Sequence, residues 1–371
     1  MASVGPKIRP MGRAARRPAA EAARPAPART DPGSAAGVAG VDLDEVDLDV
    51  IAALQLDPRA PFDRIADLLG GSGRTVARRV ERMVDAGILR FVGEVHRSLL
   101  SEGSRVHSFV RTEPQRINDV AAALTEMPEV AFCCTTAGRA SVYCTAVPAG
   151  GARADFLTRR LPAVPGILAT RSEIELRVLR KASSWRLPRL TPAQRRELTR
   201  PEGEFALRPR PLSEEERGAV ELLRADSRLA FADLARALGM TQPRARRLVL
   251  GLFEEGLVRP RVDIEPSALG YRTEAIISLN TRFGRTAAVA DALARYEGTR
   301  YVARVAGTAS LLCQVVFRDE TALADFMDGQ LSGVDEVVQA EVSVILDVTK
   351  RLWIPRHGAL LGEPRFPDLL A

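Results

Sequence analysis

The sequence contains the same unit twice. Residues 43–182 align with residues 212–351 at a constant offset of 169, without a gap. This period is too long for a solenoid repeat, so each copy is expected to form a domain or a pair of domains, and two copies act most simply as a covalent dimer. Identical residues at matched positions include Leu54, Asp57, Arg59, Phe62, Gly70, Arg78, Gly87 and Arg90 against Leu223, Asp226, Arg228, Phe231, Gly239, Arg247, Gly256 and Arg259.

The net charge of +6 is concentrated at the N-terminus. Residues 1–40 hold seven basic and two acidic residues, so the rest of the chain is close to neutral. This segment is rich in Ala, Pro and Arg without apolar periodicity, which predicts a disordered basic tail. Any DNA-facing surface elsewhere must be a local basic patch.

Cysteine usage and hydropathy exclude several classes of protein. The four cysteines form no C-x-x-C pair, as expected of buried thiols in a reducing compartment. No apolar run approaches the ~18–20 residues that span a bilayer, and no signal peptide is evident. We expect a soluble, cytoplasmic protein. The sequence shows no Walker loop, metal-ligand cluster or nucleophile triad, so no metal, cofactor or catalytic residue is predicted.

Each copy is predicted to open with three helices. Residues 43–56 and 212–225 form the first, and residues 61–69 form a short amphipathic second helix in copy one. Gly70 is expected to end that helix. Ser72, or Thr241 in copy two, is expected to be the N-cap of the third helix.

The third helix carries a basic face opposite an apolar stripe. The stripe is formed by Val76, Val80, Met83 and Val84, and in copy two by Ala245, Val249, Leu252 and Phe253. A strand is predicted next, within Ile88–Val95 or Leu257–Ile264. This order predicts a winged helix-turn-helix, whose third helix fits a major groove. The exposed residues predicted to face DNA are Ser72, Arg74, Thr75, Arg78, Arg79 and Arg82 in copy one and Thr241, Gln242, Arg244, Arg246 and Arg247 in copy two.

Within this set we assign two roles. Base contacts are predicted for Arg74 and Arg78 in copy one and for Gln242 and Arg244 in copy two. Arg79, Arg82 and Arg247 are predicted to contact phosphate.

The second half of each copy has the pattern β-α-β-β-α-β, which predicts a ferredoxin-like domain and makes the fold class α+β. Such a sheet has helices on one face only, so the two sheets can pack face to face. The predicted organisation is a tail (1–40), a winged helix-turn-helix (41–97), a ferredoxin-like effector or assembly domain (104–182), a linker (183–211) with a short helix near Pro192–Thr199, a second winged helix-turn-helix (212–266), a second ferredoxin-like domain (272–351) and a C-terminal tail (352–371).

This domain pair, with the openings Leu43-Asp-Glu-Val-Asp-Leu-Asp-Val-Ile51 and Ile65-Ala-Asp-Leu-Leu-Gly70, resembles the Lrp/AsnC (feast/famine) family of transcription regulators. The resemblance covers about three quarters of the chain in a tandem-duplicated form. It implies a regulator that binds double-stranded DNA, associates further with itself and responds to a small, amino-acid-like effector near the turns that contain Gly138, Ser141, Gly307 and Ser310.

Those turns depart from the family pattern. Many members carry an acidic residue three positions after the glycine, where this chain has Ser141 and Ser310. A carboxylate that could pair with an amino-acid ammonium is therefore missing in both copies. Either the effector is of another class, another group binds it, or there is none.

Two alternatives remain at this point. The domain pair is also similar to that of the siroheme decarboxylases of haem synthesis, and Gly87-Ile-Leu-Arg-Phe-Val-Gly93 is mildly similar to their wing. Such chemistry needs cationic groups and a histidine or tyrosine in a cavity, and none of His96, His107 and His357 recurs at the repeat offset. The near-neutral body also allows an interaction module without base readout.

Overall fold

Three helices open each copy. They are α1 (Glu45–Leu56), α2 (Phe62–Leu69) and α3 (Gly73–Asp85) in copy one, and α7 (Glu214–Ala225), α8 (Phe231–Ala237) and α9 (Gln242–Glu254) in copy two. The structure, a computed structural model, describes residues 42–96, 99, 104–149, 151–199 and 211–367. These residues belong to one unit that spans residues 38–371. The predicted tail, residues 1–40, lies outside the described residues.

Local sequence explains where these helices begin and end. Asp44 and Asp47 form a reciprocal capping box at the start of α1, as Ser213 and Glu216 do for α7. Gly70 ends α2 in the left-handed region, with φ of 75°, which a residue with a Cβ adopts only at a cost. The predicted C-terminal stop is therefore confirmed.

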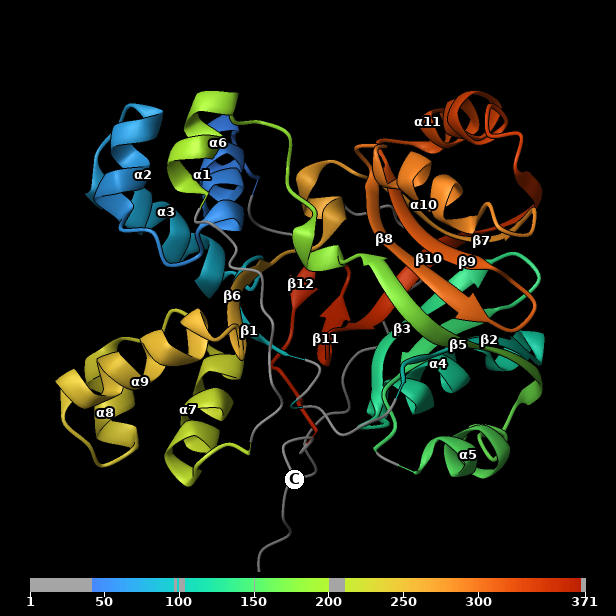
Figure 1. The fold of residues 1–371 in the computed structure, drawn as a ribbon, viewed down its shortest axis with the longest axis horizontal. Coiled ribbons are helices and arrows are strands. Elements are labelled where there is room, and N and C mark those ends of the chain that lie inside the picture. The colour runs from blue at the N-terminus through green and yellow to red at the C-terminus, as the bar shows by residue number, and fades with distance from the viewer. Residues whose placement is uncertain (1–41, 97–98, 100–103, 150, 200–210, 368–371) are drawn as a thin grey trace, which may run out of the picture. The chain divides into compact units, whose positions relative to one another are not determined.

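One strand follows each set of helices, and the two strands pair with each other. β1 (Arg90–Val95) and β6 (Val258–Asp263) form an antiparallel two-stranded ladder, which we call the wing ladder. In Figure 1 the helices of copy one (blue) and copy two (yellow) lie on either side of it. The predicted wing is thus shared between the two copies. Gly93 permits close packing here, because a Cβ at this position would lie 2.6 Å from the Leu223 carbonyl oxygen.

The second half of each copy has the predicted β-α-β-β-α-β order. Copy one has β2 (Val106–Thr112), α4 (Ile117–Glu126), β3 (Val130–Ala137), β4 (Val142–Ala146), α5 (Arg153–Asp155) continued by η3 (Phe156–Arg160), and β5 (Ile167–Arg180). Copy two has β7 (Thr273–Thr281), α10 (Thr286–Ala294), β8 (Thr299–Ala306), β9 (Leu311–Phe317), α11 (Glu320–Asp325) continued by η6 (Phe326–Leu331), and β10 (Val337–Arg351). The ferredoxin-like pattern is confirmed.

The two ferredoxin-like sheets are joined at both edges. β5 pairs with β8, and β10 pairs with both β3 and β7, so the order β10-β3-β4-β2-β5-β8-β9-β7 closes on itself. The inward faces form a shared core that includes Phe109, Tyr143, Ile276, Tyr301 and Leu312. The helices of each copy cover a separate outer core. The sheets therefore face each other, as expected, and their edges are also sealed, which removes the free strand edges.

Short elements complete the described chain. η2 (Pro114–Arg116) precedes α4, and η5 (Pro266–Leu269) precedes β7. η4 (Ala182–Ser184) overlaps the start of the segment predicted as a linker, and α6 (Pro192–Leu198) lies within that segment, which confirms the expected short helix. The segment predicted as a C-terminal tail contains two strands, β11 (Ile354–His357) and β12 (Leu360–Leu361), which extend the sheet from β10.

The gap-free alignment of the copies is wrong beyond β4. The segment between β9 and η6 is one residue longer than its counterpart, so Asp155-Phe156 corresponds to Asp325-Phe326 at an offset of 170. Strand register agrees, because Val106 pairs with Ile174 and its equivalent Ala275 pairs with Val344. No helix among the described residues is long and apolar enough to cross a membrane.

Candidate functional site

Helix α3 presents the residues predicted to face DNA. The Ser72 hydroxyl accepts a hydrogen bond from the Thr75 amide and caps the helix, as predicted. Arg74, Thr75 and Arg78 are exposed. Val76, Val80 and Met83 are buried in the expected stripe, whereas Val84 is 37% exposed and does not belong to it.

Two further arginines of α3 are already engaged within the domain. Arg79 donates to Asp44 at 2.7 Å and to Asp47 at 2.8 Å, and Arg82 also pairs with Asp47. The Asp47 side chain is fully buried, so these arginines neutralise a carboxylate that would otherwise be costly to bury. Arg79 therefore stabilises the domain through its ion pairs, whereas Arg74 and Arg78 point outward and make no ion pair among the described residues.

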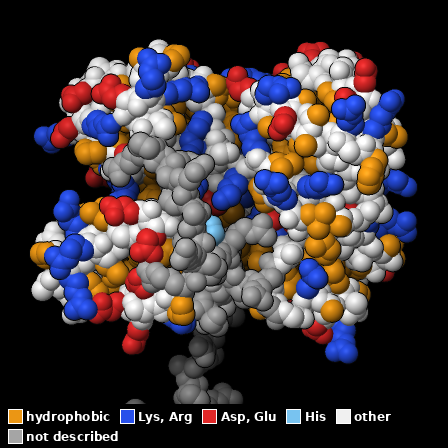
Figure 2. Space-filling view, viewed as in Figure 1, with side chains coloured by type: hydrophobic (Ala, Val, Ile, Leu, Met, Phe, Trp, Pro, Cys, Tyr) orange, Lys and Arg blue, Asp and Glu red, His pale blue; other side chains and the backbone are white. Residues whose placement is uncertain are grey.

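Helix α9 presents a different surface. Gln242, Arg244, Arg246 and Arg247 are all exposed, and Arg244 pairs with Glu215 of α7 at 2.7 Å. Thr241 is at the N-cap position but makes no side-chain capping hydrogen bond. Figure 2 shows Lys and Arg side chains over both groups of helices, mixed with Asp and Glu.

Two arginines connect the helix-turn-helix units reciprocally. Arg59 of copy one donates to the carbonyls of Ser227 and Leu229, and Arg228 of copy two donates to the carbonyls of Pro58 and Ala60. These arginines are repeat equivalents. Each also lies over an aromatic ring of the other copy, Arg59 over Phe231 and Arg228 over Phe62. The contact is therefore symmetric, like the interface of a homodimer.

The glycine turns predicted to bind an effector lie against the other copy. Gly138 and Gly307 have φ of 156° and 158°, and a Cβ at Gly307 would clash with the Glu173 carboxylate. Glu173 comes from β5 of copy one, is buried, and accepts a hydrogen bond from Thr308 at 2.6 Å. Residue Ser343 takes the equivalent place at Gly138. Ser141 and Ser310 are partly buried, and the effector role of these turns stays a prediction.

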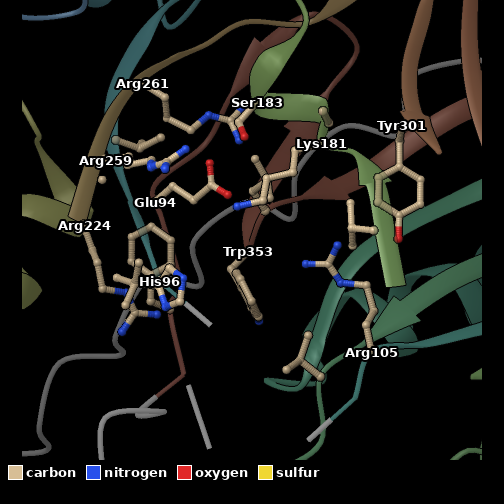
Figure 3. A pocket seen from close by; sticks show the side chains of 18 of the residues that line it. Glu94, His96, Arg105, Lys181, Ser183, Arg224, Arg259, Arg261, Tyr301 and Trp353 are labelled. Carbon is tan, nitrogen blue, oxygen red and sulfur yellow. The ribbon is translucent and has the colours of Figure 1, made fainter. Parts of the chain in front are cut away.

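A cavity lies between the wing ladder and the sheet, with a volume of about 160 Å³. Figure 3 shows Glu94, Arg259 and Arg261 projecting from the ladder, Lys181 and Ser183 beside them, and Arg105 and Tyr301 on the opposite side. Its lining also includes His96, Arg224, Trp353 and Phe366. A second cavity of about 1110 Å³ adjoins it and shares Glu94, Lys181, Ala182, Ser183, Arg259 and Arg261.

A buried polar cluster forms one side of the first cavity. Tyr301 donates to Glu175, and its hydroxyl lies 3.3 Å from His107 Nε2, while His107 Nδ1 lies 2.6 Å from the Tyr143 hydroxyl. Burial opposes ionisation of Glu175, but the hydrogen bond with His107 and the charge of Arg105 lower its pKa to about 2. Burial lowers the pKa of His107, so a carboxylate and a neutral imidazole are expected here.

Sequence reasoning missed this cavity. Arg105, Tyr301 and Trp353 belong to segments far apart in the chain, and in the sequence His96 is only a histidine that does not recur at the repeat offset. One signal was available: several lining residues differ in charge from their repeat equivalents, as Arg105 does from Glu274. Among the described residues no group of three or more His, Cys, Asp or Glu is placed to hold a metal ion.

This architecture is that of a helix-turn-helix protein with paired ferredoxin-like domains. The AsnC-type helix-turn-helix domain matches residues 43–84, and the Lrp/AsnC ligand binding domain matches residues 106–185 and 274–352. Together these matches cover more than half of the chain. Residues 221–261 match the IclR helix-turn-helix domain. The chain therefore belongs to the Lrp/AsnC family of transcription regulators, with its ligand-binding domain present twice.

Regulators that are similar in sequence to this chain each align with a single copy of the repeated unit. The transcriptional regulator LrpA of Pyrococcus horikoshii is 27% identical over 140 residues, which are 38% of this chain and 99% of LrpA. LrpA of Pyrococcus abyssi is 26% identical over the same length. Among solved structures, the siroheme decarboxylase NirDL has a similar fold across both copies. It aligns with a TM-score of 0.58 and 14% identity over 84% of this chain and 93% of that chain.

Proposed function

We propose that this chain binds specific sequences of double-stranded DNA as a covalent pseudo-dimer, regulates transcription and is not an enzyme. The observation that carries the proposal is the reciprocal Arg59–Arg228 contact, which ties two helix-turn-helix units together while α3 and α9 keep exposed basic residues. Two recognition helices in one unit would read half-sites about one helical turn, ~34 Å, apart or a multiple of it.

The two recognition helices differ, so the site should be asymmetric. Copy one presents Arg74 and Thr75 at the start of its helix, where copy two has Pro243 and Arg244. A homodimer would instead read a palindrome.

A genomic selection tests the proposal. Purified protein is mixed with sheared DNA from its source at near-physiological salt, and the bound fragments are sequenced. A few sharp peaks that share an asymmetric two-part site are the expected result. Uniform retention that is lost with added salt would reflect phosphate contact alone and would contradict specific readout.

Further self-association also belongs to the proposal. The equivalent strands β5 and β10 each expose apolar side chains, Leu168 and Leu176 in one and Val338 and Leu346 in the other, with exposed fractions of 57–68%. Such residues favour contact with another molecule. Light scattering at increasing protein concentration is expected to show masses above one chain, and a constant monomer mass would contradict this part.

A second candidate function is a siroheme decarboxylase-like enzyme. Such an enzyme needs a histidine or tyrosine among cationic groups in a cavity. His96 and Tyr301, which are far apart in the sequence, both line the first cavity together with cationic side chains. NirDL, whose fold is similar to this chain across both copies, is a siroheme decarboxylase. Anaerobic incubation with siroheme and mass analysis of the product tests this candidate. A product lighter by carbon dioxide would favour the enzyme, and unchanged siroheme would favour the regulator.

A further inference from the structure

The repeat creates two equivalent junctions between the wing ladder and the sheet, and they differ in occupancy. The wing ladder maps onto itself at the offset of 169, since the pair Arg90–Asp263 becomes Arg259–Glu94. One junction, which we call the open junction, contains the cavity around Glu94, Arg105 and Lys181. The other, which we call the filled junction, contains β11 and β12 of the chain itself.

The filled junction is acidic and is neutralised from within. Asp263, Glu265 and Glu274 bring three buried carboxylates to this place. Arg356 of β11 pairs with Asp263 and Glu265. Arg351 at the end of β10 pairs with Glu265 at 3.0 Å and with Glu274 at 2.8 Å. Arg261 and Arg300 complete this cluster through ion pairs with Asp263 at 3.2 Å and with Glu274 at 3.5 Å. The inserted strand adds Arg356 to a cluster in which every buried carboxylate has a cationic partner.

The open junction has the opposite charge at the same positions. The equivalents of Asp263, Glu265 and Glu274 are Glu94, His96 and Arg105, and the equivalent of Arg351 is Lys181 at the offset of 170. Glu94, Arg105 and Lys181 sum to +1, whereas Asp263, Glu265, Glu274 and Arg351 sum to −2. Lys181 has therefore lost the carboxylates that its counterpart Arg351 uses.

Neighbouring groups increase this positive charge. Arg224, Arg259 and Arg261 line the cavity; Arg224 donates to the Pro367 carbonyl, and Arg261 pairs with Asp263. The other lining carboxylate, Glu175, already accepts a hydrogen bond from Tyr301. Arg300 lines the adjoining cavity, is buried, and forms an ion pair with Glu274 at 3.5 Å, while its Nε has no hydrogen-bond partner. An anion that reached this cavity would meet donors that are already ordered.

The remaining walls are apolar and aromatic. Val95, Val178, Leu352 and Trp353 line the first cavity, and Phe253 and Trp185 line the adjoining one. Together the volumes of about 160 Å³ and about 1110 Å³ reach the size of a small-molecule site. The ligand that fits combines several negative groups with an apolar or planar body.

We propose that the open junction binds a small molecule with several carboxylate groups, which takes the place that Arg356 and its strand occupy in the filled junction. This inference supplies a ligand class for the proposed regulator and rests on that function for its regulatory meaning. Binding itself is measured without DNA, so failure of the site and failure of the regulator are distinguishable.

The test uses benzoate, trimesate and mellitate, which carry progressively more carboxylates on the same planar ring. Calorimetry measures affinity, and intrinsic tryptophan fluorescence reports occupancy, because the two tryptophans of the chain, Trp353 and Trp185, line the two cavities. We expect affinity to rise along the series. Arg259→Ala should weaken mellitate about tenfold, and the exposed Lys181→Ala several-fold.

Matched variants locate the site. Arg90→Ala removes the equivalent of Arg259 at the filled junction, and Arg74→Ala removes a cation of α3, so both should leave mellitate affinity within about twofold. The proposal is overturned if mellitate does not bind the folded protein. It is also overturned if Arg90→Ala or Arg74→Ala weakens binding as much as Arg259→Ala, because the anion would then sit elsewhere.

Discussion

At the scale of single residues, α3 separates arginines that face outward from arginines that hold the domain together. Arg74 is exposed with no carboxylate beside it among the described residues, whereas Arg79 pairs with Asp44 and Asp47. We therefore expect Arg74→Ala to weaken the selected DNA site by ~1–3 kcal/mol and to relax the preference for one base pair. Titrations against single-base variants of the site measure this effect.

Arg79→Ala is the matched control within the same helix. It removes one of the two cationic partners of the buried Asp47, so its main effect should be on the free energy of unfolding, with a loss of about 1–3 kcal/mol. The order of base preferences should stay unchanged in this variant. Equal weakening of all DNA sequences by Arg74→Ala would contradict the assignment of that residue to base readout.

Glu265 should make the free energy of unfolding depend on pH in the acidic range. Burial raises the pKa of this carboxyl, but Arg351 and Arg356 lower it to about 2, below the ordinary value of 4.5. A folded-state pKa below the unfolded value means that the stabilisation is fully present above about pH 4.5 and is lost as the pH falls towards 2. Denaturant unfolding at a series of pH values should show this decline.

Glu265→Gln should remove that pH dependence and cost about 3–5 kcal/mol near neutral pH, because two buried guanidinium groups lose a carboxylate. Glu363→Gln is the control, since Glu363 is exposed and pairs with Arg90 at the surface. Its cost should stay below about 1 kcal/mol. Similar losses in both variants would mean that the buried cluster contributes little.

At the scale of elements, the loops after α1 and α7 hold the two helix-turn-helix units together, and we expect them to fix the spacing of the two proposed recognition helices. Arg59 and Arg228 each bind backbone carbonyls of the other helix-turn-helix unit. The double variant Arg59→Ala with Arg228→Ala should weaken a two-part DNA site about tenfold, because the second recognition helix loses its fixed position. Affinity for an isolated half-site should change less than about twofold.

A matched surface arginine controls for lost charge. Arg236 of α8 is exposed and pairs with Asp233 of the same helix, so Arg236→Ala removes a cation without touching the contact between the copies. It should affect the two-part site and the half-site equally. The idea of a preset geometry fails if the Arg59 and Arg228 double variant behaves in the same way.

The elements of each copy were predictable because their signals are local. Apolar spacing defines α2 and α3, and Gly70 and Ser72 mark their ends. Pairing between β1 and β6, and between β5 and β8, leaves no local pattern, since any twisted strand edge with free amides can accept a partner. The closed ring was therefore not predictable from the sequence.

The candidate sites divide in the same way. Arg74 and Arg78 follow from the helical repeat of α3, whereas the engagement of Arg79 depends on Asp47, a residue of another helix. The cavity joins residues such as His96, Lys181 and Trp353, which only the tertiary fold brings together. Strands β11 and β12 were missed because Pro, Gly and charged residues dominate their surroundings.

At the scale of the whole molecule, duplication within one chain frees the two copies to diverge. A homodimer must place the same residues at both half-sites and at both junctions. Here Arg74 and Thr75 of copy one correspond to Pro243 and Arg244 of copy two. In the same way, one junction is filled by β11 and β12, whereas its equivalent contains a cavity. We expect the asymmetry of the DNA site to originate at the start of the two recognition helices, whose N-terminal residues lie nearest the bases.

A graft tests this origin. The substitutions Gln242→Gly, Pro243→Arg and Arg244→Thr give α9 the first three residues of α3. The next predicted base contact, Arg78, needs no change because its equivalent in copy two, Arg247, is also an arginine. Because base readout concentrates at the start of the recognition helix, the grafted protein should select an inverted repeat of the half-site of copy one. Random-sequence selection with both proteins compares the sites. An asymmetric site that persists after the graft would mean that readout of copy two depends on residues outside the start of α9.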